Sequence, residues 1–337
     1  MTGTNRVALV LGSGGARGYA HIGVVQVLEE LGAEIVAVAG SSVGAGMGGM
    51  LAAGRLGDFT EWALGLGQIE ALRLLDVSLT AKGAIRGEKM FRVVADLVGD
   101  TLIEDLPMAY TAVAVDLAAQ REVWFQQGPL EVAIRASSAM PMFLAPVELN
   151  GRMLVDGGVL DPVPVAPVAS ASADLVVAVN LAGRGPIADR PVSASASEGE
   201  EDTSEGLRRS AARWFDSDLM ASVRRRLPAD LEDSVRAHLE KEREAKPDMP
   251  GSLEVMQLSA EAMQAALTRH RLAAHPPDVL INVPKHAART LQLHKAEEMI
   301  ELGRDLARDA LAPWFAGPDG PSAQGAAGPS APDGAPG

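Results

Sequence analysis

The sequence predicts an α/β protein with a three-layer α/β/α architecture, in which helices cover both faces of a mostly parallel central sheet. Short apolar runs alternate with segments whose apolar residues recur at helical spacing, and the first run ends in a glycine-rich loop. This alternation is typical of right-handed strand–helix–strand units. With 337 residues, 47% of them hydrophobic and 22% charged, the chain is long enough to bury such a core.

The first part of the chain supplies two strand–helix units. Residues Arg6–Leu11 form an apolar run that suits a strand buried on both faces. After the glycine-rich loop, apolar residues at helical spacing precede Gly32, which is expected to end the helix: they are Ile22, Val25, Leu28 and Leu31. Residues 34–39 then predict a second buried strand, and 42–53 predict a second helix.

The uncharged stretch 35–54 is long enough to cross a bilayer. It contains six glycines and two adjacent serines, and only its beginning is rich in β-branched residues. We therefore interpret it as a strand, a tight turn and a helix of small residues, and not as a membrane span.

Later elements alternate in the same way. Asn150-Gly151 is typical of a two-residue hairpin turn and has apolar residues on both sides. Strands are predicted at 110–115, 122–125, 147–149, 153–155, 175–179 and 279–283, and a closing amphipathic helix at 295–311.

One domain over residues 5–315 accounts for these elements, and two regions depart from the pattern. Residues 183–251 are first acidic and then arginine-rich, which we interpret as a charged helical insertion or flap. Within it, 207–227 gathers arginines around aromatic residues, which suits peripheral contact with anionic lipid. The alternative is a solvated amphipathic helix packed on the protein's own surface. Residues 316–337 are largely Gly, Pro, Ala and Ser, and we expect a disordered tail.

Composition excludes several classes of function. The net charge of −14 opposes binding to nucleic acid, and the absence of cysteine excludes disulfides, thiolate metal sites and cysteine nucleophiles. No secretory signal is visible near the first residues, so the expected location is the cytoplasm or a peripheral position at the inner membrane face. The sequence does not predict an oligomeric state.

The segment Gly40-Ser41-Ser42-Val43-Gly44 has the G-x-S-x-G pattern and lies between a predicted strand and a predicted helix. In that context a serine on a sharp turn exposes its hydroxyl as a nucleophile, and the flanking glycines relieve crowding. The helix N-terminus also directs its dipole at a developing oxyanion. The alternative is a plain turn in which a serine caps the helix.

The loop Gly12-Ser13-Gly14-Gly15-Ala16-Arg17-Gly18 joins the first strand to the first helix. It is not a dinucleotide fingerprint, because Arg17 stands where a glycine is needed, and it lacks the Lys-Ser/Thr pair of a phosphate loop. No cofactor is expected. The amides near Gly14 and Gly15 suit an oxyanion hole for acyl transfer. The alternative is a tight turn that serves helix packing.

A third segment, Val155-Asp156-Gly157-Gly158, ends the strand that leaves the hairpin and alone is ordinary turn chemistry. Together the segments resemble bacterial patatin-like phospholipases, a family that also includes plant patatins and neuropathy-target-esterase-type lipases. The resemblance rests on four motifs in order over about residues 5 to 182: Gly12–Gly18 with Ala20–Val24, Gly40–Ala45, Ala133–Ser138 with Pro141, and Asp156–Val165.

The resemblance implies a patatin-like fold and a serine–aspartate dyad, with Ser42 as nucleophile and Asp156 as general base. The oxyanion hole would comprise Gly14, Gly15, Arg17 and Gly18. The implied activity is hydrolysis of lipid acyl esters through an acyl-serine intermediate, without cofactor or metal. Burial would raise the pKa of Asp156, which is otherwise a weak base.

Alternatives stay open at this point. An acyltransferase or a non-catalytic, membrane-associated regulatory protein could share the same fold. An ordinary triad would instead draw its base from the late histidines, namely His270, His275, His286 and His294. His21 is expected to pack or cap rather than to act as a base. Arg135, Ser137 and Ser138 are expected either to shape the site or to serve as loop scaffolding.

Overall fold

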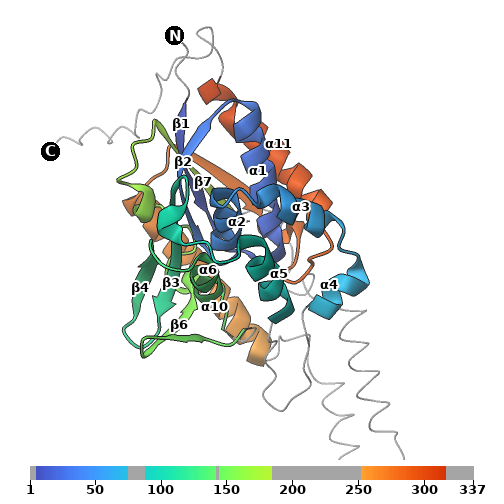
Figure 1. Cartoon of the computed structure of the whole chain (residues 1–337), viewed down its shortest axis with the longest axis vertical. Coiled ribbons are helices and arrows are strands. Elements are labelled where there is room, and N and C mark those ends of the chain that lie inside the picture. Colours follow the sequence, from blue (N-terminus) through green and yellow to red (C-terminus); the bar gives the residue numbers. More distant parts are fainter. Residues whose placement is uncertain (1–4, 75–87, 142–143, 184–251, 316–337) are drawn as a thin grey trace, which may run out of the picture. The chain divides into compact units, whose positions relative to one another are not determined.

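The computed structural model describes residues 5–74, 88–141, 144–183 and 252–315. Its eight described strands form one sheet in the order β5-β6-β3-β2-β1-β7-β8, with β4 paired to β3 (Figure 1). The strands β1 (Arg6–Leu11), β2 (Glu34–Ser41), β3 (Ala109–Asp116), β7 (Leu175–Gly183) and β8 (Val279–Pro284) run parallel. The remaining strands, β4 (Arg121–Phe125), β5 (Val147–Leu149) and β6 (Arg152–Asp156), are antiparallel to their partners. The mixed α/β class with a mostly parallel sheet is confirmed.

The predicted strand–helix units are present with small shifts in their ends. Helix α1 (Tyr19–Glu30) follows β1 after a short 3-10 turn at Gly15–Gly18, and Gly32 adopts φ 71° just beyond the helix. Helix α2 (Val43–Ala52) follows β2 directly. The stretch 35–54 is therefore strand, turn and helix, as expected. In the described part of the chain, no helix is long and apolar enough to span a bilayer.

Strand β3 is the element on which three others pair. It runs parallel to β2 over its first residues and antiparallel to β4 and β6 over its last. The hairpin β5–β6 turns at Asn150 and Gly151, whose φ angles of 52° and 72° are those that a type I′ turn requires. The Asn-Gly signal thus predicted this hairpin correctly.

Alternate residues of β1 belong to two different cores. Val7, Leu9 and Leu11 pack with α1, α2 and the last helix α11 (Ala296–Phe315). Ala8 and Val10 face the other side, where the segment around the 3-10 turn Ala166–Val168 and part of α10 (Ser252–Ala274) contribute Val163, Val165, Val168 and Leu272. A strand covered on both faces reads as a continuous apolar run, which explains the sequence pattern.

Five α-helices have no predicted counterpart. These are α3 (Leu56–Leu64), α4 (Gln68–Leu74), α5 (Glu88–Val98), α6 (Leu130–Ser137) and α10, which begins after the predicted insertion. Chain contacts divide the protein into two units, 1–185 with 262–337, and 186–261. The sheet belongs to the first unit, and only 252–261, the start of α10, is described in the second. The insertion at 183–251, its stretch 207–227 and the tail 316–337 lie almost wholly outside the described residues, so those expectations stay predictions.

Candidate active site

Ser42 occupies the turn between β2 and α2 in a conformation that few non-glycine residues adopt. Its φ of 57° and ψ of −125° lie in a region that costs an L-residue about 1–3 kcal/mol. The side chain is almost fully buried, with 4% exposure. The Ser42 carbonyl accepts hydrogen bonds from the N–H groups of Ala45 at 2.9 Å and Gly46 at 3.2 Å. Ser42 is therefore the N-cap residue of α2.

The glycines two residues before and after Ser42 are required by packing. A Cβ on Gly40 would lie 2.3 Å from the Gly44 carbonyl carbon, and a Cβ on Gly44 would lie 1.9 Å from the Leu11 carbonyl oxygen. Neither backbone atom can move without displacing β1 or α2. The G-x-S-x-G pattern therefore fits a strand, a strained turn and a helix pressed closely together.

Strand β3 brings Ser42 and Asp156 together, although they are far apart in sequence. Ser41 at the end of β2 is paired with Val113 of β3, and Asp156 at the end of β6 is paired with the next residue, Ala114. Gly157 fills the junction, because a Cβ there would lie 2.1 Å from the Val113 oxygen and 2.9 Å from the Ser41 hydroxyl. The register of two strand pairs thus sets the position of the aspartate beside the serine.

The Asp156 carboxyl is buried and only half satisfied. Its Oδ1 accepts the Gly158 N–H at 2.7 Å, whereas Oδ2 has no hydrogen-bond partner among the described residues. Burial raises the pKa of Asp156 from 3.8 to about 6, against the lowering effects of the Ser42 hydroxyl and the Gly158 N–H. The hydroxyl is thus close enough to influence the carboxyl, although it forms no hydrogen bond with Oδ2. Such pairs commonly tighten when substrate binds.

Two amides of the glycine loop have no hydrogen-bond acceptor among the described residues. The N–H groups of Gly12, Ser13 and Ala16 donate to the carbonyl oxygens of Val179, Pro162 and Thr290 at 2.8–2.9 Å. Within the described residues, the N–H groups of Gly14 and Gly15 donate to none. Gly15 has φ 60° and lines the same cavity as Ser42. Both amides are candidates for an oxyanion hole, and of these two residues Gly15 lines the cavity.

Gly18 and Arg17 serve the loop differently. A Cβ on Gly18 would lie 2.2 Å from Val43 Cγ2, so this glycine lets the loop approach α2. The Arg17 guanidinium donates to three backbone carbonyls, those of Leu181 (2.8 Å), Ala288 (2.7 Å) and Lys285 (3.2 Å). Its side chain therefore ties the loop to β7 and to the segment before α11, and it does not line the cavity.

His21 is fully buried beneath the same loop. Its Nε2 lies 2.9 Å from the Gly12 carbonyl, so Nε2 carries the proton and donates it. Burial lowers the pKa of His21 to about 4, although the hydrogen bond to Gly12 acts in the opposite direction. The imidazole is thus neutral at physiological pH and holds the loop, which agrees with the expectation of a packing role.

Polar residues behind the turn fix its backbone. Ser137 Oγ accepts the Ser42 N–H at 3.0 Å and donates to the Val113 carbonyl at 2.6 Å. Ser138 donates more weakly to the Ser42 carbonyl, at 3.3 Å. The guanidinium of Arg135 lies 4.4 Å from the centre of the Phe91 ring and so links α6 to α5. These three residues shape the site, which is one of the two roles the sequence left open.

A second buried carboxyl, that of Asp161, lies near the turn that contains Ser41 and Ser42. The Ser41 hydroxyl donates to the Asp161 carbonyl at 2.7 Å, and the side-chain Oδ1 of Asp161 has no partner among the described residues. Burial, aided by Glu122, raises the pKa of Asp161 to about 7, against the opposing effects of Arg271 and the Val163 N–H. Arg271 of α10 is hydrogen-bonded to Glu122 of β4.

An apolar cavity of about 200 Å³ opens beside Ser42. One face of α2 lines it, and α3, α4 and α5 contribute five further lining residues. Its polar lining residues are Tyr19, Ser42, Ser138 and Thr290, and the others that enclose it include Val43, Met47, Met50, Phe59, Leu74, Met90, Phe91, Val94, Ile134, Met140, Leu144, Leu291 and Leu293. A serine hydroxyl at the edge of an apolar cavity can meet the carbonyl of an acyl chain that fills it.

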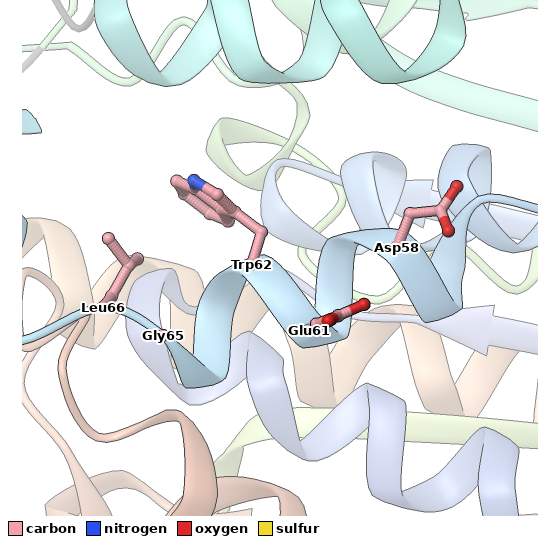
Figure 2. A pocket seen from close by; sticks show the side chains of 5 residues that line it. All are labelled: Asp58, Glu61, Trp62, Gly65 and Leu66. Carbon is pink, nitrogen blue, oxygen red and sulfur yellow. The ribbon is translucent and has the colours of Figure 1, made fainter.

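Other candidate groups lie away from this cavity. His270, His275 and His286 are exposed, His294 is half-buried, and none of the four lines the cavity. Among the described residues, no group of three or more His, Asp or Glu side chains is placed to hold a metal ion. A second, open hollow lies along the exposed side of α3 and is lined by one helix and the two residues that follow it: Asp58, Glu61, Trp62, Gly65 and Leu66 (Figure 2). None of these five residues carries a hydroxyl group.

Comparison with known proteins identifies the family. The family model of patatin-like phospholipases matches residues 9–169. A protein of Mycobacterium tuberculosis, named as an uncharacterized NTE family protein, is 46% identical over 333 residues, which cover 91% of each chain. The chain belongs to the patatin-like NTE family.

More distant members of the NTE family match about half of this chain. Lysophospholipase nte1 of Emericella nidulans is 31% identical over 190 residues, 52% of this chain and 12% of that protein. Human patatin-like phospholipase domain-containing protein 6 is 33% identical over 184 residues, 52% of this chain and 13% of that protein. These relatives are therefore much longer proteins in which the shared region is a small part.

Proposed function

We propose that this NTE family protein hydrolyses carboxylic ester bonds of lipids, with Ser42 as the nucleophile and Asp156 as the general base. The observation that carries the proposal is the position of Ser42, on a strained turn beside a buried carboxyl and at the edge of an apolar cavity. Family membership and the name of the fungal relative, a lysophospholipase, support a lipid ester as the substrate.

In the proposed acylation step, the acyl chain fills the cavity and places its carbonyl carbon over Ser42 Oγ. As Oγ bonds to that carbon, its proton passes to Asp156 Oδ2, the carboxylate oxygen that has no partner among the described residues. The oxyanion accepts hydrogen bonds from the N–H groups of Gly14 and Gly15 and is stabilised by the N-terminus of α2. Asp156 then gives the proton to the leaving alcohol, and the acyl group stays on Ser42.

Deacylation reverses these roles. A water molecule attacks the acyl carbon and gives a proton to Asp156, which returns it to Ser42 Oγ as the fatty acid leaves. The raised pKa of Asp156, about 6, helps in both steps. At neutral pH the carboxyl is mostly ionised and ready to accept a proton, yet it is more basic than an ordinary aspartate.

Labelling with a fluorophosphonate probe tests this proposal, because the probe reacts only with an activated serine. The wild-type protein and Ser170→Ala, a variant of an exposed serine, should be labelled, whereas Ser42→Ala should not. Ser42→Ala should also lose hydrolysis of p-nitrophenyl esters and lysophospholipids. A wild-type protein that neither reacts with the probe nor hydrolyses esters would refute the proposal. Analysis of products formed with an added alcohol distinguishes hydrolysis from acyl transfer.

A further inference from the structure

Helix α2 and its approach contain five glycines, and four of them are closely packed against neighbouring atoms. A Cβ on any of these four would lie less than 3 Å from a neighbouring atom: 2.3 Å for Gly40, 1.9 Å for Gly44, 2.9 Å for Gly48 and 2.8 Å for Gly49. Gly46 is different, because the nearest atom to its added Cβ is Ile134 Cγ2 at 3.9 Å, an ordinary contact. Neighbouring atoms therefore leave room for a side chain at Gly46.

The backbone does not require glycine at position 46 either. Gly46 lies inside the α-helix Val43–Ala52, is absent from the positive-φ residues and donates its N–H to the Ser42 carbonyl. Glycine inside a helix is less favourable than alanine, so the residue lowers stability without a local structural gain. It is half-buried and lines the cavity beside Ser42. Because Gly46 has no side chain, the cavity keeps space there that a ligand can fill.

Gly46 lies beside the space that an acyl chain held at Ser42 would fill, because both residues line the same cavity. It follows Ser42 by four residues, so it lies about one turn further along α2. Met50, another turn on, continues this wall of the cavity. A side chain at position 46 would take up space in this cavity, which Phe59 and Val94 also line.

We infer that Gly46 determines the length of acyl chain that the protein accepts, and that the cavity holds one acyl group of about eight carbons. An apolar cavity of about 150 Å³ holds one benzene, which corresponds to about 25 Å³ per carbon. The cavity of about 200 Å³ thus takes about eight carbons of a single chain, with the alcohol part of the ester outside. This inference rests on the proposed acyl transfer at Ser42.

The decisive variant is Gly46→Leu, measured with p-nitrophenyl esters from acetate to palmitate. A leucine side chain adds four carbons, which occupy about half of the cavity. We expect the preferred ester to shift from octanoate to butyrate, with kcat/KM for octanoate about 100-fold lower because about four methylenes lose their buried site. Acetate should be hydrolysed within about threefold of the wild-type rate, because its acyl group does not reach position 46.

Gly46→Ala and a second glycine provide the controls. The single methyl group of Gly46→Ala should lower the preferred length by about one carbon and leave the fold intact, so the test survives if the leucine variant does not fold. Gly57 lies in α3, is exposed and has no atom within 4 Å of an added Cβ. Gly57→Leu should keep the wild-type preference. Thermal unfolding of each variant checks that it is folded.

The outcomes separate this inference from the proposed function. Wild-type hydrolysis that depends on Ser42, combined with an unchanged preference in a folded Gly46→Leu variant, refutes the role of Gly46. A wild-type preference for palmitate refutes the estimate of about eight carbons. Absence of Ser42-dependent hydrolysis for every ester refutes the proposed function itself. A shift toward shorter esters in Gly46→Leu but not in Gly57→Leu supports the inference.

Discussion

Replacing Asp156 by asparagine tests the proposed base directly. The amide keeps the shape of the carboxyl and can still accept the Gly158 N–H, but it cannot take a proton from Ser42. We expect kcat/KM for ester hydrolysis to fall by about 10²- to 10⁴-fold, the usual contribution of a general base. In the wild-type protein, kcat/KM should fall as the pH drops through about 6, because Asp156 then becomes protonated.

The same substitution should change stability in a pH-dependent way. Burial raises the pKa of Asp156 from 3.8 to about 6, so between these pH values the folded protein holds a proton that the unfolded chain has lost. The free energy of unfolding of the wild type therefore decreases as the pH rises through this range. At about 1.4 kcal/mol per pKa unit, the total is about 3 kcal/mol. Asp156→Asn does not have this pH-dependent loss. The difference between its unfolding free energy and that of wild type should therefore increase by about 3 kcal/mol as the pH rises from 3.8 to about 6.

Urea unfolding of both proteins at a series of pH values measures the difference. The pKa values of His21 and Asp161 are also shifted, but both proteins contain these residues. Their contributions to the pH dependence of the unfolding free energy therefore cancel in the difference between the two proteins. The control is Asp116→Asn, which alters another buried carboxyl, one that accepts the Ala119 N–H and lies 3.9 Å from Arg152, away from the cavity. This control should keep its activity. A fall in kcat/KM of less than about tenfold in Asp156→Asn would refute Asp156 as the general base. A difference in unfolding free energy that does not vary with pH would refute its raised pKa.

Three further predictions concern the turn and the loop. The unfolding free energy of Ser42→Gly should be about 1–3 kcal/mol higher than that of Ser42→Ala, because glycine adopts φ 57° without strain. Equal unfolding free energies of the two variants would contradict this. Arg17→Lys should lower the unfolding free energy by about 2 kcal/mol and reduce kcat, since an ammonium cannot reach three carbonyls; wild-type values in both assays would contradict it. The unfolding free energy of His21→Gln should fall less than that of wild type as the pH drops from about 6.5 to 4. Wild type loses stability in this range because His21 gains a proton in the unfolded chain before it does in the folded protein. Unfolding free energies that change with pH by the same amount in both proteins would contradict this.

Local patterns in the sequence predict much of this fold. An apolar run marks β1 because a strand covered on both faces has no polar side to interrupt it. Asn150-Gly151 predicts a hairpin because two successive residues there need positive φ. The G-x-S-x-G segment predicts a strained turn because both of its glycines meet backbone atoms of neighbouring elements. Each of these signals depends on residues close together in the chain.

The rest depends on contacts between distant residues, which periodicity does not reveal. Asp156 lies beside Ser42 only through the register of β2 and β6 on β3. The Arg17 side chain reaches carbonyls 164 and 271 residues away, so no local pattern distinguishes it from a loop residue that faces substrate. The cavity is not predicted from the sequence either, because its lining residues come from separate parts of the chain, from Gly15 to Leu293.

The shared use of β3 has a consequence for the newly made chain. Asp156 follows Ser42 by 114 positions, so synthesis delivers the nucleophile well before the proposed base. Until the last strand of the hairpin joins β3, the serine turn has no carboxyl beside it to accept a proton. In the proposed dyad, reactivity toward esters is therefore a property that the polypeptide gains only late in folding, and an incomplete chain does not attack surrounding lipids.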